Sequence, residues 1–253
     1  MSMRGLQEKI IVVTGAAQGI GAAYARRLVE EGSTVVLADR NRDGAEASAS
    51  ALGGPGKASA YQLDVADRPS CEAFAAHLSD TYGRVDGLIN NAAVFSTIHM
   101  KPFWEITDDE WNQVLTVNLR GPWLLTSALL GLLRRSESGS VVNVGSDAVQ
   151  LGRPGYLHYV ASKGGVHGMT FSMARELGQF GIRVNTLSPG PVYTEIPRET
   201  VTPEQREAML ATQALHRVAG PDDMIGAVAF LLSDDAAYLT GQTLSVNGGL
   251  LHR

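Results

Sequence analysis

Short apolar runs alternate along this chain with longer stretches of helical spacing, and this alternation constrains the fold more than any other feature. Runs such as Ile10–Val13 are wholly apolar, as expected for strands that are covered on both faces. A repeating strand–helix order predicts a parallel sheet between two layers of helices, an α/β fold. The expected strands are 10–13, 34–38, 58–63, 87–90, 140–144, 183–187 and 243–246, and the expected helices are 20–31, 42–52, 67–82, 107–133, 157–178 and 221–233.

Residues 189–220 break the alternation, because they carry several prolines and show no strand pattern. A long insertion in a compact domain is typical of a functional lid, so we expect this segment to cover the substrate. No linker, repeat or low-complexity stretch divides the chain, and 253 residues fit one large α/β domain. We therefore expect a single dinucleotide-binding domain over residues 1–253.

The net charge of −5, without any lysine- or arginine-rich run, argues against nucleic acid as the main partner. A single cysteine, Cys71, excludes an intramolecular disulfide. The apolar runs at 10–13 and 123–133 are too short for a signal peptide or a membrane span. We expect a soluble, cytoplasmic protein with no membrane partner, and the sequence indicates no metal site.

A glycine-rich turn joins the first expected strand to the first expected helix. It reads Thr14-Gly15-Ala16-Ala17-Gln18-Gly19-Ile20-Gly21. Glycines allow a close approach of the backbone to a pyrophosphate, and the following helix offers its N-terminal N–H groups and positive dipole end. The turn therefore predicts a dinucleotide site, with simple strand–helix packing as the alternative.

An acidic residue, Asp39, ends the second expected strand eighteen residues after Gly21. This is near the spacing expected for a carboxylate that binds the ribose hydroxyls, and such a carboxylate would repel a 2′-phosphate. The sequence therefore favours NAD(H) over NADP(H). Arg40 leaves NADP(H) open, because an arginine could pair with a 2′-phosphate if Asp39 turned away. Gln18 adds no positive charge.

Two further segments after expected strands could touch the nucleotide. Asp64 and Val65 could hold the adenine, although Asp64 could instead be an acidic cap before the next helix. The residues at 90–93 are Asn90-Asn91-Ala92-Ala93. Small residues there would let a nucleotide lie against the backbone, and tight packing is the alternative.

Tyr159 and Lys163 stand four residues apart, and Ser146 lies thirteen residues before the tyrosine. On a helix this spacing places the phenol and the ammonium one turn apart on one face. A nearby positive charge favours ionisation of a phenol, whose free pKa is about 10, so Tyr159 could exchange a proton with an alcohol or a ketone. Tyr156 has no lysine four residues on, and His158 would point elsewhere on the helix.

Together these features resemble the short-chain dehydrogenase/reductase family, essentially from Thr14 to Gly249. The chain departs from the family pattern at Ala93, where a glycine is usual, and at Gly145-Ser146, where a serine pair is usual. Asn247 replaces a frequent aspartate, which we expect to be structural. The resemblance rests on the glycine turn at 14–21, Asn90–Ala93, Asn118 within Val117-Asn118-Leu119, Ser146 before Tyr159 and Lys163, and Pro189-Gly190 with Thr194.

The resemblance implies a Rossmann-type, three-layer fold with about seven parallel strands and helices on both faces. It also implies hydride transfer to or from a nicotinamide. The catalytic residues would be Asn118, Ser146, Tyr159 and Lys163, with Lys163 binding the nicotinamide ribose and Ser146 the substrate oxygen. The implied cofactor contacts are Gly15, Gln18, Gly19, Ile20, Gly21, Asp39, Arg40, Asp64, Val65, Asn91, Ala92, Tyr159, Lys163, Pro189, Gly190, Val192 and Thr194.

The expected substrate pocket is largely apolar with a few polar points, which suits a hydrophobic secondary alcohol or ketone. No arginine or lysine cluster indicates a clamp for a phosphate or a carboxylate. An acyl-carrier thioester remains open, because its carrier would be recognised at the surface. The expected lining residues are Phe95, Ser146, Asp147, Gln150, Tyr156 and Tyr193, with Ile196, Met209 and Leu210 from the lid.

Two expected helices are apolar nearly all round. Residues 119–133 carry one charge, Arg120, and residues 157–174 carry one, Lys163. Such helices need cover on nearly all sides, and the sheet supplies only one. We therefore expect both to pair with their copies in a homodimer, within a homotetramer, and the tail at 241–253 to make a second contact.

The sequence is compatible with three functions. The leading one is an NAD-dependent dehydrogenase of a hydrophobic secondary alcohol, or the reverse ketone reduction. The second is an NADPH-dependent 3-oxoacyl thioester reductase, against which Asp39 argues. The third is a non-enzymatic NAD sensor or scaffold, which would be expected to lack a catalytic residue that this chain retains.

Overall fold

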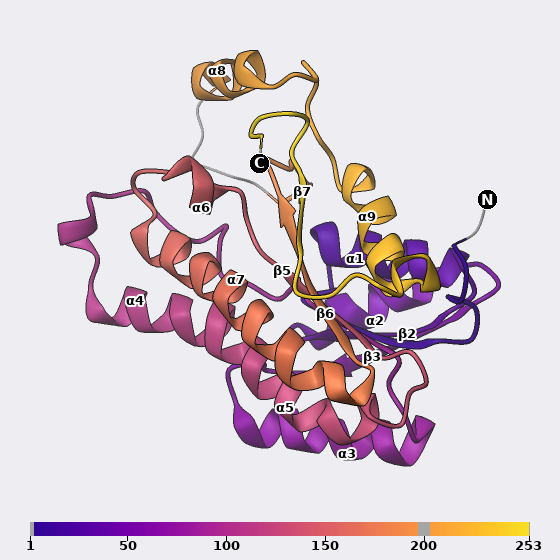
Figure 1. Ribbon diagram of the computed structural model, residues 1–253. Helices are drawn as coiled ribbons and strands as arrows, with labels where there is room; N and C mark the ends of the chain where they lie inside the picture. The colour runs from indigo at the N-terminus through magenta and orange to yellow at the C-terminus, as the bar shows by residue number, and fades with distance from the viewer. Residues whose placement is uncertain (1–2, 197–202, 253) are drawn as a thin grey trace.

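The computed structural model describes residues 3–196 and 203–252. Its strands form one parallel sheet in the order β3-β2-β1-β4-β5-β6-β7 (Figure 1). The strands are β1 (Ile10–Thr14), β2 (Thr34–Asp39), β3 (Lys57–Gln62), β4 (Gly87–Asn90), β5 (Ser140–Val144), β6 (Arg183–Pro189) and β7 (Thr243–Val246). The α/β prediction and the seven parallel strands are confirmed.

Helices cover both faces of the sheet (Figure 1). One layer contains α1 (Gly19–Glu30), α2 (Arg42–Ala51) and α9 (Asp222–Leu232), and the other contains α3 (Arg68–Tyr82), α5 (Gly121–Leu133) and α7 (Leu157–Leu177). Successive side chains of a strand point to opposite faces. In β1, Ile11 and Val13 accordingly join the core under α1 and α9, whereas Val12 joins the core under α3 and α5.

The helix expected over 107–133 is interrupted, which corrects the sequence prediction. It consists of α4 (Asp108–Leu115), a π-helical turn over Thr116–Arg120, and α5. Pro122 follows the π turn and has no N–H to donate, so a regular helical ladder cannot continue through it. The N–H of Gly121 instead reaches back five residues to the carbonyl of Thr116.

The expected lid has more local structure than its prolines predicted. β6 runs on to Pro189, Val192 forms a bridge with Ala219, and α8 spans Pro203–Thr212. In Figure 1, α8 stands beyond the ends of β6 and β7. Residues 197–202 lie outside the described residues, and the role of the segment as a lid stays a prediction.

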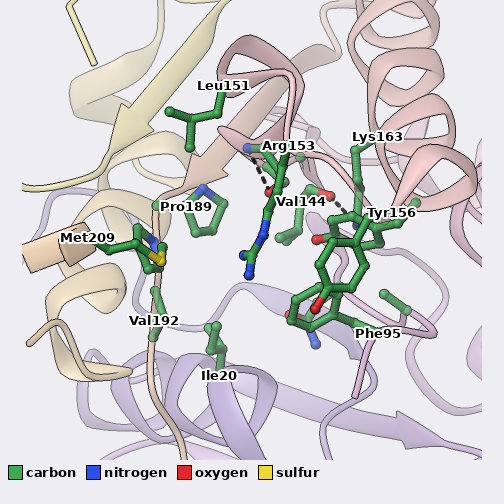
Figure 2. Close-up of a pocket in the computed structure, with 18 residues that line it drawn as sticks. Ile20, Phe95, Val144, Leu151, Arg153, Tyr156, Lys163, Pro189, Val192 and Met209 are labelled. Atoms are coloured by element: carbon green, nitrogen blue, oxygen red, sulfur yellow. Dashed lines mark hydrogen bonds between the residues drawn. The ribbon is translucent and has the colours of Figure 1, made fainter. Parts of the chain in front are cut away.

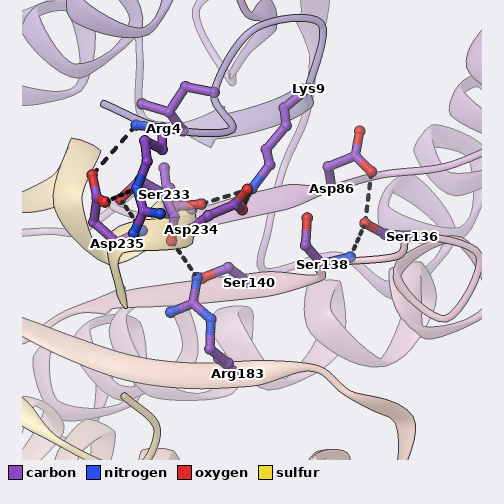
Figure 3. A network of polar contacts seen from close by, with 12 residues as sticks. Arg4, Lys9, Asp86, Ser136, Ser138, Ser140, Arg183, Ser233, Asp234 and Asp235 are labelled. Atoms are coloured by element: carbon purple, nitrogen blue, oxygen red, sulfur yellow. Dashed lines mark hydrogen bonds and ion pairs between the residues drawn. The ribbon is translucent and has the colours of Figure 1, made fainter. Parts of the chain in front are cut away.

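The amino-terminal edge of the sheet is held by a polar network (Figure 3). The Nζ of Lys9 lies 3.1 Å from Asp234 Oδ1, and Arg4 pairs with Asp235. Arg183, the first residue of β6, donates to the carbonyl of Leu231 at 2.8 Å. These contacts hold the end of α9 against the amino-terminal ends of the strands, on the side of the sheet away from the carboxyl ends.

From β1 the chain adds β2 and β3 on one side, and it then returns to add β4 to β7 on the other side of β1. In open parallel sheets, ligands bind at the carboxyl ends of the strands next to such a reversal. The fold therefore places a binding crevice beside the glycine turn after β1. Among the residues that the structure describes, no helix is both long and apolar enough to cross a bilayer.

Candidate active site

A pocket opens at the carboxyl ends of β4, β5 and β6 (Figure 2). Side chains come from the carboxyl ends of these strands and from the start of α1. Others come from α6 (Ala148–Leu151), α7 and α8. Its lining residues are Ile20, Asn91, Ala93, Phe95, Val144, Gly145, Ser146, Ala148, Leu151, Arg153, Tyr156, Tyr159, Lys163, Pro189, Gly190, Pro191, Val192 and Met209.

The glycine turn has the geometry that its sequence predicts. Gly15 and Gly19 have φ of +64°, a region that favours glycine. A Cβ on Gly21 would lie 2.2 Å from the carbonyl oxygen of Gly15, so only glycine lets α1 pack so closely on the turn. The side chain of Asn91 holds the turn against β4 by donating to the carbonyls of Thr14 and Gly15.

An acidic side chain already lies on this turn. Oε1 of Glu195 accepts the N–H of Gly19, the first residue of α1, at 2.7 Å. An oxyanion is the group that a helix N-terminus is expected to bind. The Glu195 carboxylate is thus a stand-in for a phosphate oxygen, and the turn fits the pyrophosphate of a dinucleotide. Sequence reasoning did not identify Glu195.

Asp39 ends β2 beside the glycine turn. Its Oδ2 accepts the N–H of Ala17 at 3.0 Å, and its Oδ1 accepts the N–H of Asn41 at 2.9 Å. Each carboxylate oxygen can accept a second hydrogen bond, so the side chain can also receive ribose hydroxyls. Arg40 is exposed on the next residue. The geometry fits a nucleotide with a free ribose at this point, and the cofactor contact itself stays a prediction.

The segment after β3 makes its own local structure. Asp64 Oδ1 accepts the N–H of Ala66 at 2.9 Å, and the N-terminal cap of α3 is Asp67 rather than Asp64. Val65 is buried against Gly121 at the start of α5. An adenine contact at Asp64 and Val65 stays a prediction.

Tyr159 and Lys163 lie on the first turns of α7 and line the same pocket. The Lys163 Nζ is 5.9 Å from the centroid of the Tyr159 ring and donates to the carbonyl of Val144 at 2.8 Å. An ammonium has three donors, so two others can serve the phenol or a ribose. Phe95 packs against the Tyr159 ring, with 4.7 Å between the ring centroids.

Burial lowers the pKa of this lysine. Only 3% of Lys163 is exposed, and desolvation lowers the pKa of its ammonium to about 8. The group is still protonated in most molecules at neutral pH. His158, one residue before Tyr159, is also buried, and desolvation lowers its pKa from the usual value. His158 does not line the pocket.

Ser146 lies at the end of β5, where the short helix α6 (Ala148–Leu151) begins. Its Oγ accepts the N–H of Ala148 at 3.2 Å. The hydroxyl therefore caps the turn and retains its own hydrogen for donation. Because it lines the pocket with Tyr159 and Lys163, three of the four expected catalytic residues converge there.

The fourth, Asn118, lies behind the pocket wall on the π turn and is 1% exposed. Its Oδ1 accepts the N–H of Val94 at 2.7 Å, and its Nδ2 donates to the Val94 carbonyl and to Ser162 Oγ. This side chain fixes the loop after β4 against α7. A catalytic role of Asn118 stays a prediction.

The expected substrate residues divide into two groups. Phe95 and Tyr156 line the pocket, as does Met209 from α8. Asp147 does not line it. Its side chain is fully buried and accepts hydrogen bonds from Ser188 of β6, from Ser245 of β7 and from Asn247, which follows β7. Tyr193, Gln150, Ile196 and Leu210 are likewise not among the lining residues. Asn247 fills the structural role expected of it by donating to Asp147 at 2.5 Å.

One charged pocket residue was missed by the sequence analysis. Arg153 lies between α6 and α7, and its guanidinium carbon is 4.8 Å from the centroid of the Tyr156 ring. Figure 2 shows its side chain extending across the pocket. The available sequence signal was its place between Ser146 and Tyr159. The sequence analysis looked for a cluster of cations and therefore passed over this single arginine.

The chain is similar to known proteins over nearly its whole length. A family model described as enoyl-(acyl carrier protein) reductase matches residues 15–251. The chain is 39% identical to a 3-oxoacyl-[acyl-carrier-protein] reductase of Vibrio harveyi over 245 residues, covering 97% of this chain and 98% of that protein. It is 36% identical to a protein of the same name from Thermotoga maritima over 251 residues, covering 97% and 99%.

Two solved structures are also similar. One is a short-chain dehydrogenase/reductase, glucose/ribitol dehydrogenase, of Brucella melitensis, with a TM-score of 0.92, 31% identity and 100% of each chain covered. The other is a putative short-chain alcohol dehydrogenase of Sinorhizobium meliloti, with a TM-score of 0.90, 29% identity and 98% and 97% covered. The sequence analysis favoured a dehydrogenase of a free alcohol and gave a 3-oxoacyl reductase as the alternative. The names of the curated relatives support the alternative better.

Proposed function

The chain belongs to the short-chain dehydrogenase/reductase family of oxidoreductases, and from that premise we propose that it reduces the keto group of a 3-oxoacyl compound. The observation that carries this proposal is the convergence of Ser146, Tyr159 and Lys163 in one pocket beside the glycine turn. The substrate class is supported by the names of the relatives that cover nearly the whole chain.

The pocket residues have separate tasks in this reaction. A bound nicotinamide supplies the hydride that reaches the keto carbon. The Ser146 hydroxyl donates a hydrogen bond to the keto oxygen, and the Tyr159 hydroxyl gives that oxygen its proton. The Lys163 ammonium stabilises the negative charge that Tyr159 acquires. In the direction of alcohol oxidation the same proton returns to Tyr159.

We propose NAD(H) as the cofactor, on the strength of Asp39. A carboxylate at the end of β2 suits ribose hydroxyls and repels a 2′-phosphate. The two hydrogen bonds from Ala17 and Asn41 hold this carboxylate in place, which counts against its turning away to let Arg40 take over. This combines the cofactor of the leading sequence interpretation with the substrate class of its alternative.

A second candidate is the oxidation of a free, hydrophobic secondary alcohol. The apolar lining of Phe95, Leu151, Val192 and Met209 favours it. The two candidates share their chemistry and differ in the group attached to the reacting carbon. Acetoacetyl-CoA and a panel of aryl and alkyl ketones therefore separate them when each is assayed with NADH and with NADPH.

Tyr159→Phe tests the catalytic assignment itself. We expect it to lower kcat for any reduced ketone by about 100- to 10,000-fold, the usual contribution of general acid catalysis. The Kd for NADH, measured by fluorescence, stays at the wild-type value because the ring is retained. Tyr238→Phe, at a fully exposed tyrosine, is the matched control. Turnover by Tyr159→Phe at the wild-type rate would refute the proposed acid.

A further inference from the structure

The pocket has an excess of positive charge. Of the described residues that line it, Lys163 and Arg153 are charged, and none is an aspartate or a glutamate. Lys163 is engaged with the Val144 carbonyl and lies beside Tyr159. The proposed reaction therefore gives Lys163 a task and leaves Arg153 without one.

The backbone around Arg153 is built to direct its side chain into the pocket. Gly152 ends α6 in the left-handed region, with φ of +58°, and this turns the chain back. The N–H of Arg153 then donates to the carbonyl of Ala148 at 3.3 Å. The guanidinium stacks on the face of Tyr156, which is itself 1% exposed and rigidly packed.

None of the ion pairs within residues 3–196 and 203–252 includes Arg153. A half-buried guanidinium presents several donors in a planar fork, which matches the two oxygens of a carboxylate. An arginine in a largely apolar pocket, with no acidic side chain among the described lining residues, is complementary to an anionic ligand.

We propose that Arg153 binds a carboxylate carried by the substrate, so that the preferred substrate is a free keto acid. This inference rests on the proposed function and narrows its substrate class. α6 separates Ser146 from Arg153, so the groups that would hold the keto oxygen and the carboxylate come from the two ends of one short helix. A 3-oxo acid carries its keto and carboxyl groups close together, as this arrangement requires.

The cofactor does not provide an equally good partner for Arg153. Its pyrophosphate is expected at the N-terminus of α1, where the N–H of Gly19 already binds a carboxylate. Arg153 instead belongs to the segment between Ser146 and Tyr159, the two residues assigned to the keto oxygen. Its side chain therefore enters the pocket from the wall that carries Ser146 and Tyr156 and stacks on Tyr156.

Acetoacetate and methyl acetoacetate form a matched pair for the test, because they share the keto group and differ in the charge of the acid. With NADH, we expect Arg153→Met to lower kcat/KM for acetoacetate by about 30- to 100-fold, as for loss of a charged hydrogen bond. The value for the ester is expected to stay close to wild type. Arg153→Lys, which keeps the charge and loses the fork, should retain an intermediate value for acetoacetate.

Arg134→Met is the control, because Arg134 also stacks on an aromatic ring, that of Phe180, far from the pocket. It is expected to change neither substrate. Equal losses of kcat/KM for acid and ester in Arg153→Met would overturn the proposal. Such a result would mean that Arg153 contacts a neutral oxygen shared by both compounds, or that the substitution disturbs the fold. Unchanged kinetics with both compounds would overturn it as well. The Kd for NADH checks that each variant has folded.

A direct binding measurement separates this inference from the proposed function. Titration calorimetry of acetoacetate into the enzyme–NAD⁺ complex requires no turnover. If the wild type reduces neither these two ketones nor acetoacetyl-CoA, the proposed function fails. Binding of acetoacetate to the wild type with loss in Arg153→Met would still support the carboxylate site. Equal binding by both proteins, or by neither, would refute the site.

Discussion

At the level of single residues, Lys163 links the electrostatics of the pocket to pH. Desolvation lowers the pKa of its ammonium to about 8, whereas an exposed lysine titrates near 10.5. In the proposed reaction its charge helps Tyr159 to give up a proton to the keto oxygen. Loss of that charge removes the stabilisation of the phenolate that the proton transfer leaves behind.

We therefore expect kcat/KM for ketone reduction to fall as the pH rises through about 8. The decline should approach about tenfold per pH unit, the limiting slope for loss of one essential proton. A pH profile of initial rates with saturating NADH measures it. Lys163→Arg is the control, because a guanidinium keeps its proton throughout this range. A profile for the wild type that is flat to pH 10 would contradict the assignment.

Lys163 affects the stability of the fold in the opposite direction to activity as the pH rises. Between pH 8 and 10.5 the unfolded chain binds more protons at Lys163 than the folded chain does. The contribution of Lys163 to the free energy of unfolding therefore rises with pH in this window. The titration of Lys163 itself therefore does not destabilise the fold above pH 8, and thermal unfolding at each pH shows whether a loss of activity there accompanies a loss of fold.

Neighbouring residues also mark the limit of what the sequence could predict. Ser146 and Asp147 are adjacent, but only Ser146 faces the pocket, while Asp147 is buried against β6 and β7. The motif spacing identified Ser146 and could not tell which way the next side chain points. Arg153 was missed because its direction depends on the left-handed turn at Gly152.

At the level of elements, the strands were predictable because short apolar or β-branched runs stand out between longer stretches of helical spacing. Three of the expected strands, 87–90, 140–144 and 243–246, have the observed bounds, and the others differ only at their ends. Short or interrupted helices were not predictable. α6 has four residues, too few for helical periodicity, and the π turn before Pro122 depends on a local break in hydrogen bonding.

The segment after β6 places Glu195 where the cofactor is expected. Its carboxylate accepts the N–H of Gly19, and Ile196 lies over the same glycine. A pyrophosphate at this helix N-terminus must displace or repel that carboxylate. We therefore expect the position of residues 190–196 to depend on whether the dinucleotide site is filled.

Removing this negative charge should improve cofactor binding. We expect Glu195→Gln to lower the Kd for NADH about fivefold, since a charge at a helix N-terminus contributes about 1 kcal/mol. Isothermal titration with NADH measures the change. Glu204→Gln, an exposed carboxylate on α8, is the matched control. Weaker binding by Glu195→Gln would mean that Glu195 supports the cofactor instead of competing with it.

At the level of the whole molecule, α5 and α7 keep apolar side chains on their outer faces. Trp123 is 45% exposed and Phe171 is 50% exposed, and Leu157 is exposed on the same helix as Phe171. On α7, Gly164 and Gly168 lie on the face of Phe171, and no atom lies within 4 Å of a Cβ built on Gly168. Both helices therefore keep the uncovered surface that the sequence analysis expects a second copy to fill.

We accordingly expect a homodimer in which these outer faces meet, as the basis of the homotetramer that the sequence predicts. The double variant Trp123→Glu and Phe171→Glu would bury like charges at such an interface, so it should shift the protein to monomers at micromolar concentration. Analytical ultracentrifugation measures the mass. Tyr238→Glu, at a fully exposed aromatic residue that belongs to neither helix, should leave the assembly intact. A monomeric wild-type protein with full activity would show that these faces need no partner.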